Sequence, residues 1–197
     1  MKVIGVGCGP GMLTEEAIRA ITGATLVMGS KRAIELAARF VPEGCEVQVI
    51  ADFSSLSVPD HAVVLSTGDP MLAGLGYLGG EIIPGISSLQ LAASRLAIPL
   101  EDVVVVRAHG KDHGPVFATI AKALDQGNTV FIIADPKFSI PALCEAIGES
   151  GEEISVALCE DLGYPEERIT MGTVLDPPVP HSRLFSVFVG RFPGNRA

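Results

Sequence analysis

Short apolar runs alternate along the first half of the chain with segments in which apolar residues recur at helical spacing. Ala17, Ile18 and Ile21, for example, recur on one face of a helix that Thr14 opens. The apolar runs predict strands at 2–6, 24–28, 46–50, 62–65, 82–83 and 103–106, and further helices are predicted at 31–40 and 87–96. Because strands that alternate with helices form parallel sheets covered on both faces, this half predicts a mostly parallel sheet.

The second half follows a polar stretch at 107–115 that contains two glycines and a proline. Such a composition is typical of a linker, so we expect two domains, at 1–107 and 108–197. Helices are predicted at 116–125 and 140–150, and strands at 129–134, 154–158, 169–174 and 184–190. A proline-rich arm at 177–180 is expected to join the last two strands as a hairpin in a mixed sheet, and the charged residues at 166–168 to form a solvated loop. The fold class is therefore α/β, with a mostly parallel sheet followed by a mixed one.

Two turns after predicted strands carry residue types that suit ligand contact. The sequence STGDP follows the run at 62–65, and PGISS follows the run at 82–83. Asp69 before a proline suits the start of a short crossover helix, and Ser87 or Ser88 suits the N-cap of the next helix. If the two strands are parallel neighbours, both turns lie at the edge where open α/β sheets bind ligands. Local sequence supports a purely capping role for Asp69 and Ser87 as well as it supports ligand binding.

A glycine-rich loop, VGCGPG at 6–11, follows the first predicted strand. Such a loop presents backbone N–H groups to an anion or a polar ligand. The dinucleotide fingerprint fails, because its third glycine falls on Pro10 or Met12 and the next strand ends in Gly29-Ser30 without an acidic residue. No Gly-Lys-Ser/Thr of a phosphate-binding Walker loop occurs either. From these residues alone, a purely structural turn is as well supported as a ligand loop.

Composition narrows the class of protein. The 197 residues are 48% hydrophobic and can bury a substantial core. No apolar run approaches the roughly 20 residues that cross a bilayer, and glycine and proline interrupt the N-terminus as a signal peptide, so we expect a cytoplasmic protein without a membrane partner. The net charge of −9 disfavours a nucleic-acid partner. The four cysteines, none in a CxxC pair, indicate reduced and mostly buried thiols rather than disulfides or a zinc site.

Basic and titratable residues gather in the predicted linker. His109 and His113 are four residues apart, but Gly110 between them disfavours a helical metal pair, so we favour a solvated linker over a metal site. Arg107, His109 and Lys111 would suit the carboxylates of a ligand held between the domains.

In their order along the chain, these motifs resemble one family, the tetrapyrrole methylases, which are S-adenosylmethionine-dependent enzymes with two α/β domains. The matching segments are VGCGPG, STGDP, PGISSLQLAAS, the mid-chain HGK and CEDLGYPEERITMGTV. Each segment alone means little, whereas the ordered set covers nearly the whole chain and is specific. The loop after Gly11 and the crossover after Asp69 are shorter than in the family.

The resemblance implies that S-adenosylmethionine lies folded in a cleft between the two domains and is converted to S-adenosylhomocysteine. Carried onto matching positions, it implies that the cofactor is lined by Pro10, Gly68, Asp69, Leu72, Ser87, Ser88 and Ala134. With the tetrapyrrole substrate that the resemblance implies, the basic character of Arg107, His109 and Lys111 makes them candidates for binding its carboxylates, and His109 is also the candidate acid/base. No metal is expected.

Within the family, the segments PGISSLQLA and LGYPEERI are most similar to those of corrinoid enzymes that methylate C-5. The resemblance therefore implies a C-methyltransferase acting on C-5 of a cobalt-precorrin in cobalamin biosynthesis. It also implies a homodimer, and a functional partner that performs C-15 methylation and decarboxylation. The alternatives are a family member acting on another ring position or on diphthamide, and a non-catalytic module that binds an adenosyl ligand or a corrinoid.

Overall fold

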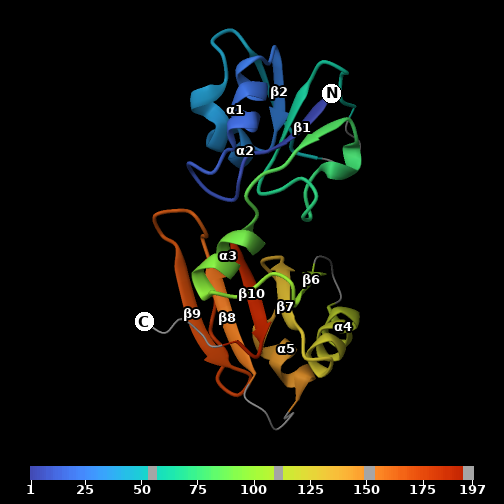
Figure 1. The fold of residues 1–197 in the computed structure, drawn as a ribbon, viewed down its shortest axis with the longest axis vertical. Coiled ribbons are helices and arrows are strands. Elements are labelled where there is room, and N and C mark those ends of the chain that lie inside the picture. Colours follow the sequence, from blue (N-terminus) through green and yellow to red (C-terminus); the bar gives the residue numbers. More distant parts are fainter. Residues whose placement is uncertain (53–56, 109–112, 149–153, 193–197) are drawn as a thin grey trace. The chain divides into compact units, whose positions relative to one another are not determined.

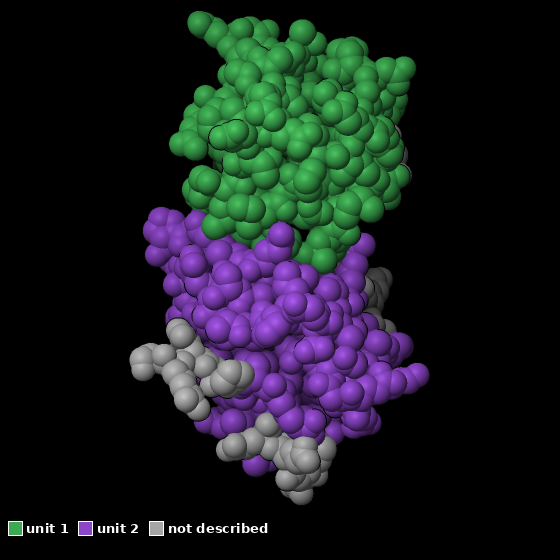
Figure 2. Space-filling model, viewed as in Figure 1, with its two compact units in different colours: residues 1–88 green, residues 89–197 purple. Residues whose placement is uncertain are grey.

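The computed structural model describes residues 1–52, 57–108, 113–148 and 154–192. The chain divides into two compact units, Met1–Ser88 and Leu89–Ala197 (Figure 2). Each unit contains a five-stranded sheet with its own hydrophobic core (Figure 1). The predicted fold class, a parallel α/β sheet followed by a mixed one, is confirmed.

The sheet of the first unit is entirely parallel. Its strands are β1 (Lys2–Gly5), β2 (Leu26–Gly29), β3 (Glu46–Val49), β4 (Val63–Ser66) and β5 (Glu81–Ile83). They lie in the order β3-β2-β4-β1-β5. The strands predicted at 62–65 and 82–83 are therefore not neighbours, because β1 lies between them and pairs with both. Since all three are parallel, their carboxyl ends still share one edge of the sheet.

Two helices cover one face of this sheet. The helices are α1 (Glu15–Thr22) and α2 (Lys31–Ala37), and α2 continues into the 3-10 turn η1 (Ala38–Phe40). Each begins where a side chain satisfies a free backbone N–H group: Thr14 Oγ1 accepts from Ala17 N at 3.1 Å, and Ser30 Oγ accepts from Ala33 N at 3.2 Å. The helix predicted to open at Thr14 is thereby confirmed.

The connection from β4 to β5 covers part of the opposite face. It contains the 3-10 turn η2 (Gly76–Leu78) and no α-helix, so the predicted crossover helix is wrong. Leu75 and Leu78 of this connection pack against a core that includes Val3 and Val64. The fourteen residues between β4 and β5 include five glycines and form turns here instead of a helix, and three of these glycines are in left-handed backbone: Gly68, Gly79 and Gly80.

The second unit has a mixed sheet in the order β6-β7-β10-β8-β9. Its elements are α3 (Ser88–Leu96), β6 (Val103–Ala108), α4 (Gly114–Asp125), β7 (Thr129–Ala134), α5 (Ile140–Ile147), β8 (Ser155–Glu160), β9 (Arg168–Thr173) and β10 (Phe185–Gly190). Only β6 and β7 are parallel, and every other neighbouring pair is antiparallel. The helices α4 and α5 pack together on one face of the sheet, over a core that includes Ile120, Leu143 and Val187 (Figure 1).

The structure differs from the sequence predictions for this unit in three places. The chain divides after Ser88 and not after Arg107, because β6 pairs with β7 of the second sheet. For the same reason the strand predicted at 103–106 does not belong to the parallel sheet of the first half: it is β6, an edge strand of the second sheet, in which Val105 is 41% exposed. The last two strands do not form a hairpin, because β8 lies between β9 and β10 and pairs with both.

Two further expectations concern cysteines and membrane helices. Cys8, Cys144 and Cys159 are buried and Cys45 is half-buried, which confirms that most of the cysteines are buried; none of the four is paired in a disulfide. Among the residues that the structure describes, no helix has the length and apolar character needed to cross a membrane.

Candidate functional site

Three turns meet at the carboxyl edge of the sheet in the first unit, after β1, β4 and β5. The backbones of Gly7 and Gly68 form an antiparallel bridge, in which Gly68 N donates to Gly7 O at 2.8 Å and Gly7 N donates to Gly68 O at 3.3 Å. Both glycines are in the left-handed region, with φ of +81° and +69°. Residues with side chains rarely adopt that conformation. The glycine-rich loop and the STGDP turn are thus joined directly through the main chain.

The third turn approaches the other two so closely that only glycine fits. A Cβ atom on Gly5 would lie 2.7 Å from Gly85 Cα and 2.8 Å from Gly68 O. A Cβ atom on Gly85 would overlap the same Gly68 carbonyl oxygen. At Gly5 and Gly85 the requirement is space and not a left-handed φ, because neither has a positive φ. The three turns therefore form one backbone cluster.

The Asp69 carboxylate holds two of these turns together. Asp69 Oδ1 accepts from Met71 N at 2.8 Å, and Oδ2 accepts from Gly85 N at 3.0 Å. Leu72 N donates to the Asp69 backbone carbonyl at 3.1 Å, which closes the turn without starting an α-helix. Asp69 therefore does not cap a helix: its two carboxylate oxygens tie the turn after β4 to the turn after β5.

The backbone cluster has an open side at Gly68. Apart from its chain neighbours, a Cβ atom on Gly68 would have one atom of the described residues within 4 Å, the Ser87 Cα at 3.9 Å. Ser87 is buried and directly precedes α3, which begins at Ser88, one residue after the predicted start. The space beside the Gly68 Cα is therefore larger than the space beside Gly5 or Gly85.

Most of the predicted cofactor residues lie in the first unit, in or near the clustered turns, and one lies in the second unit. Gly68, Asp69, Leu72 and Ser87 belong to the clustered turns, and Pro10 is exposed in the glycine-rich loop. Ala134 ends β7 in the second unit and is half-buried. Of the predicted substrate residues, Arg107 is exposed near the end of β6, while His109 and Lys111 lie outside the described residues.

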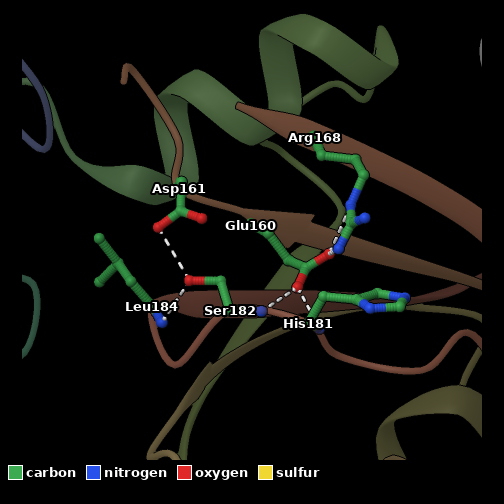
Figure 3. A network of polar contacts seen from close by, with 6 residues as sticks. All are labelled: Glu160, Asp161, Arg168, His181, Ser182 and Leu184. Atoms are coloured by element: carbon green, nitrogen blue, oxygen red, sulfur yellow. Dashed lines mark hydrogen bonds and ion pairs between the residues drawn. The ribbon is translucent and has the colours of Figure 1, made fainter. Parts of the chain in front are cut away.

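The second unit contains a buried acidic residue that the sequence analysis missed. Glu160 ends β8 and is 1% exposed. Its Oε2 accepts from Arg168 Nε at 2.9 Å and Nη2 at 2.6 Å, and its Oε1 accepts from the backbone N–H groups of His181 and Ser182 at 2.6 and 2.7 Å (Figure 3). Ser182 also donates its hydroxyl to Asp161 Oδ1 at 2.9 Å. This network ties the segment before β10 to the ends of β8 and β9.

Burial alone would raise the pKa of Glu160. The backbone N–H groups of Ser182 and His181 and the Arg168 guanidinium outweigh that effect and lower the pKa below its ordinary value. Glu160 is thus held as a carboxylate with all its strong acceptor positions filled, which is the pattern of a structural charge rather than of a proton donor.

The loop at 166–168 is not simply solvated. Glu167 Oε1 accepts from Arg95 Nε of α3 at 2.6 Å, and Oε2 accepts from Gly163 N at 2.7 Å. Burial opposes ionisation of Glu167, but the Arg95 side chain and the Gly163 N–H lower its pKa below the ordinary value. For Glu160, by contrast, the strand register reveals the charged partner, because Glu160 and Arg168 face each other across β8 and β9.

A histidine–aspartate contact lies beside the predicted linker. His113 Nε2 is 3.4 Å from Asp135 Oδ2, and the imidazole is surrounded by Phe117 and Phe138, with ring centroids at 6.4 and 5.4 Å. Lys137 N donates to the other carboxylate oxygen of Asp135 at 2.7 Å. His113 is therefore packed at the start of α4, and the described residues contain no cluster of three metal-ligating side chains.

Comparison with known proteins places this arrangement in a family. The family model of the Tetrapyrrole (Corrin/Porphyrin) Methylases matches residues 2–177. The chain belongs to the tetrapyrrole methylases. The resemblance carried by the ordered motifs is thereby confirmed, and the match spans both units of this tetrapyrrole methylase.

Curated relatives of this tetrapyrrole methylase carry related names. It is 37% identical over 128 residues to a probable cobalt-precorrin-7 C(5)-methyltransferase of Methanocaldococcus jannaschii, a match that covers 54% of this chain and 60% of the relative. It is 35% identical over 130 residues to the decarboxylating precorrin-6Y C(5,15)-methyltransferase of a Sinorhizobium species, covering 56% of this chain and 30% of the relative. The chain thus spans less than two thirds of the length of these curated relatives.

Solved structures agree over nearly the whole chain. A precorrin-6Y methylase of cobalamin biosynthesis from Archaeoglobus fulgidus is 29% identical, with a TM-score of 0.73 and 97% of each chain covered. The uroporphyrin-III C-methyl transferase of Thermus thermophilus, crystallised with S-adenosyl homocysteine, is 19% identical, with a TM-score of 0.69 and 96% of each chain covered. The second likeness shows a shared fold only.

Proposed function

We propose that this tetrapyrrole methylase is an S-adenosylmethionine-dependent C-methyltransferase that acts on C-5 of a cobalt-precorrin in cobalamin biosynthesis. The observation that carries the proposal is the cluster of three turns at one sheet edge, joined by the Gly7–Gly68 bridge and by Asp69. The names of the relatives from Methanocaldococcus jannaschii and Archaeoglobus fulgidus support the choice of a corrinoid substrate.

The clustered turns have features that suit the binding of an adenosyl ligand. There is room beside the Gly68 Cα on the side that Ser87 Cα bounds at 3.9 Å, and we propose that the adenosyl ligand packs against this side. We propose that the first unit contacts the cofactor through residues in and beside the clustered turns: Pro10, Gly68, Leu72, Ser87 and Ser88. Ala134 of the second unit remains a predicted contact. Asp69 contributes by holding the turns in place, because both carboxylate oxygens already accept backbone N–H groups.

S-adenosylmethionine, when bound, supplies an electrophilic methyl group to a nucleophilic ring carbon. The residues of the chain bind the donor, orient its sulfonium methyl group toward the ring carbon and exclude water. Alignment of two reactants can contribute about 7–11 kcal/mol to the lowering of a barrier. We assign no protein nucleophile, because methyl transfer to an electron-rich carbon requires none. Arg107, His109 and Lys111 remain predicted contacts for substrate carboxylates.

The decisive experiment combines binding and product analysis. The protein is titrated with S-adenosylhomocysteine by calorimetry, and then incubated with methyl-labelled S-adenosylmethionine and a panel of cobalt-precorrins. Label at C-5, located by NMR, is the expected result. Label at C-15 or on a pyrrole carbon would contradict the substrate position. Binding without transfer to any corrinoid would favour a non-catalytic module, and no binding of the adenosyl ligand would refute the whole proposal.

Two further parts of the proposal concern partners. The Sinorhizobium relative, of which this chain matches 30%, is named for methylation at both C-5 and C-15. We propose that C-15 methylation and decarboxylation reside outside the segment matched here, and that the chain acts as a homodimer. Sedimentation measures the second point, because a monomer at assay concentration would contradict it.

A further inference from the structure

One arginine reaches the glycine-rich loop from a neighbouring element. Arg32 Nη2 donates to the Cys8 backbone carbonyl at 2.9 Å. Cys8 is buried at 4% exposure, and Arg32 is half-buried. The contact joins residues 24 positions apart, within the same unit. A charged donor on a buried carbonyl makes a stronger hydrogen bond than two neutral groups do.

The backbone of Arg32 is fixed in position by the start of α2. It is the second residue of α2, which starts after β2 and is capped by Ser30. Gly29 brings this start close to β4, since a Cβ atom there would lie 3.1 Å from the Leu65 carbonyl oxygen and 3.5 Å from Ala33 Cβ. The guanidinium therefore extends from a fixed helix start beside β4 toward the loop that follows β1, the next strand in the sheet.

The contact determines the direction of one peptide unit. Because a trans peptide is planar, the Gly9 N–H points opposite to the Cys8 carbonyl and hence away from Arg32. Gly9 is buried, and among the described residues its N–H group has no hydrogen-bond partner. A buried backbone N–H group without a partner is rare in folded proteins and indicates that something else accepts from it.

We propose that Arg32 is a positioning residue of the cofactor loop. By holding the Cys8 carbonyl, Arg32 presents the Gly9 N–H to a hydrogen-bond acceptor on the S-adenosyl ligand. The inference rests on the proposed function, because it assigns the loop to that ligand. It adds a residue outside the loop, on α2, which neither the motifs nor the predicted cofactor residues include.

The test compares Arg32→Gln, Arg32→Lys and the control Arg19→Gln. Arg19 is an α1 arginine whose side chain is 71% exposed and 3.8 Å from Glu15, so its loss removes the same charge from the same unit without touching the loop. We expect Arg32→Gln to weaken binding of S-adenosylhomocysteine about 10- to 100-fold, the range for loss of a charged hydrogen bond. The KM for S-adenosylmethionine should rise by a similar factor with little change in kcat. Arg32→Lys should recover part of the loss, and Arg19→Gln should match the unchanged protein.

A second measurement needs no variant. In the ¹⁵N-labelled protein, the Gly9 amide proton should shift and become protected from exchange when S-adenosylhomocysteine binds. Equal affinity of Arg32→Gln and the unchanged protein, or a Gly9 amide that does not respond to the bound ligand, would overturn the inference and leave the proposed function standing. Failure of the unchanged protein to bind S-adenosylhomocysteine would instead refute the proposed function.

Discussion

Replacing Asp69 by alanine removes the carboxylate that ties the turn after β4 to the turn after β5. Two hydrogen bonds from backbone N–H groups are lost, one from Met71 and one from Gly85. Met71 is exposed, so water can accept from its N–H group, whereas Gly85 is buried and its N–H group loses its partner. A buried group left unpaired costs about 1–3 kcal/mol, and the exposed bond contributes less, about 0.5–1 kcal/mol. We expect Asp69→Ala to lower the free energy of unfolding by about 1.5–4 kcal/mol.

The same substitution should reduce the binding free energy of S-adenosylhomocysteine by more than it reduces the free energy of unfolding. Without the Asp69 carboxylate, the turn at 84–87 loses the hydrogen bond that ties Gly85 to the turn after β4, so the two turns are no longer held in a fixed arrangement before the ligand binds. Asp69→Asn keeps one acceptor oxygen but replaces the other with an NH₂ group, which faces a backbone N–H donor and cannot accept from it. We therefore expect Asp69→Asn to lower the free energy of unfolding by about half as much as Asp69→Ala does.

Urea denaturation followed by circular dichroism measures the stability, and calorimetry measures affinity for S-adenosylhomocysteine. Asp60→Asn serves as the control, because Asp60 is an exposed aspartate of the same unit. If Asp69→Ala changed neither the unfolding free energy nor the affinity, relative to this control, the carboxylate would not hold the turns and the reasoning would fail. If both fell but Asp69→Asn behaved like alanine, charge rather than hydrogen-bond geometry would be the cause.

Three further predictions concern the backbone cluster and the acidic network. Gly85→Ala should abolish adenosyl-ligand binding and destabilise the protein, because the added Cβ would overlap the Gly68 carbonyl oxygen. The control Gly23→Ala should be tolerated, because the nearest atom would lie 3.8 Å from the added Cβ. Thermal unfolding compares the stability of the two variants. Glu160→Gln should lower the unfolding free energy by about 2–4 kcal/mol in urea titrations, because it leaves a paired guanidinium without its buried carboxylate; a loss below 0.5 kcal/mol would contradict the structural role. The lowered pKa values of Glu160 and Glu167 predict stability that is fully present above the ordinary glutamate pKa of about 4.3 and lost as the pH falls through their folded-state values. Glu167→Gln should therefore show a shallower loss of stability between neutral and acid pH, and an unchanged slope would show that Glu167 does not contribute.

Part of the site could be predicted from the sequence because its signals are local. A glycine-rich loop after a strand, a GDP turn and a serine before a helix each have a short-range physical meaning, and parallel strands collect such turns at one edge. The edge was predicted correctly even though β4 and β5 are not neighbours, since the strand between them is parallel as well. The role of Asp69 was not predictable, because Gly85 N, its second partner, lies 16 residues away in sequence.

Local residue patterns were enough to determine the strands, the helix starts capped by Thr14 and Ser30, and the α/β class of both units. Hydrophobic periodicity and capping act within a few residues, so they can be read along the chain. Strand order was decided only in three dimensions: β1 inserts between β4 and β5, β8 separates β9 from β10, and β6 joins the second sheet. The long-range contacts of Glu160 and Arg32 depend on that order, because a side chain's partner is set by which strands lie beside it and in which register.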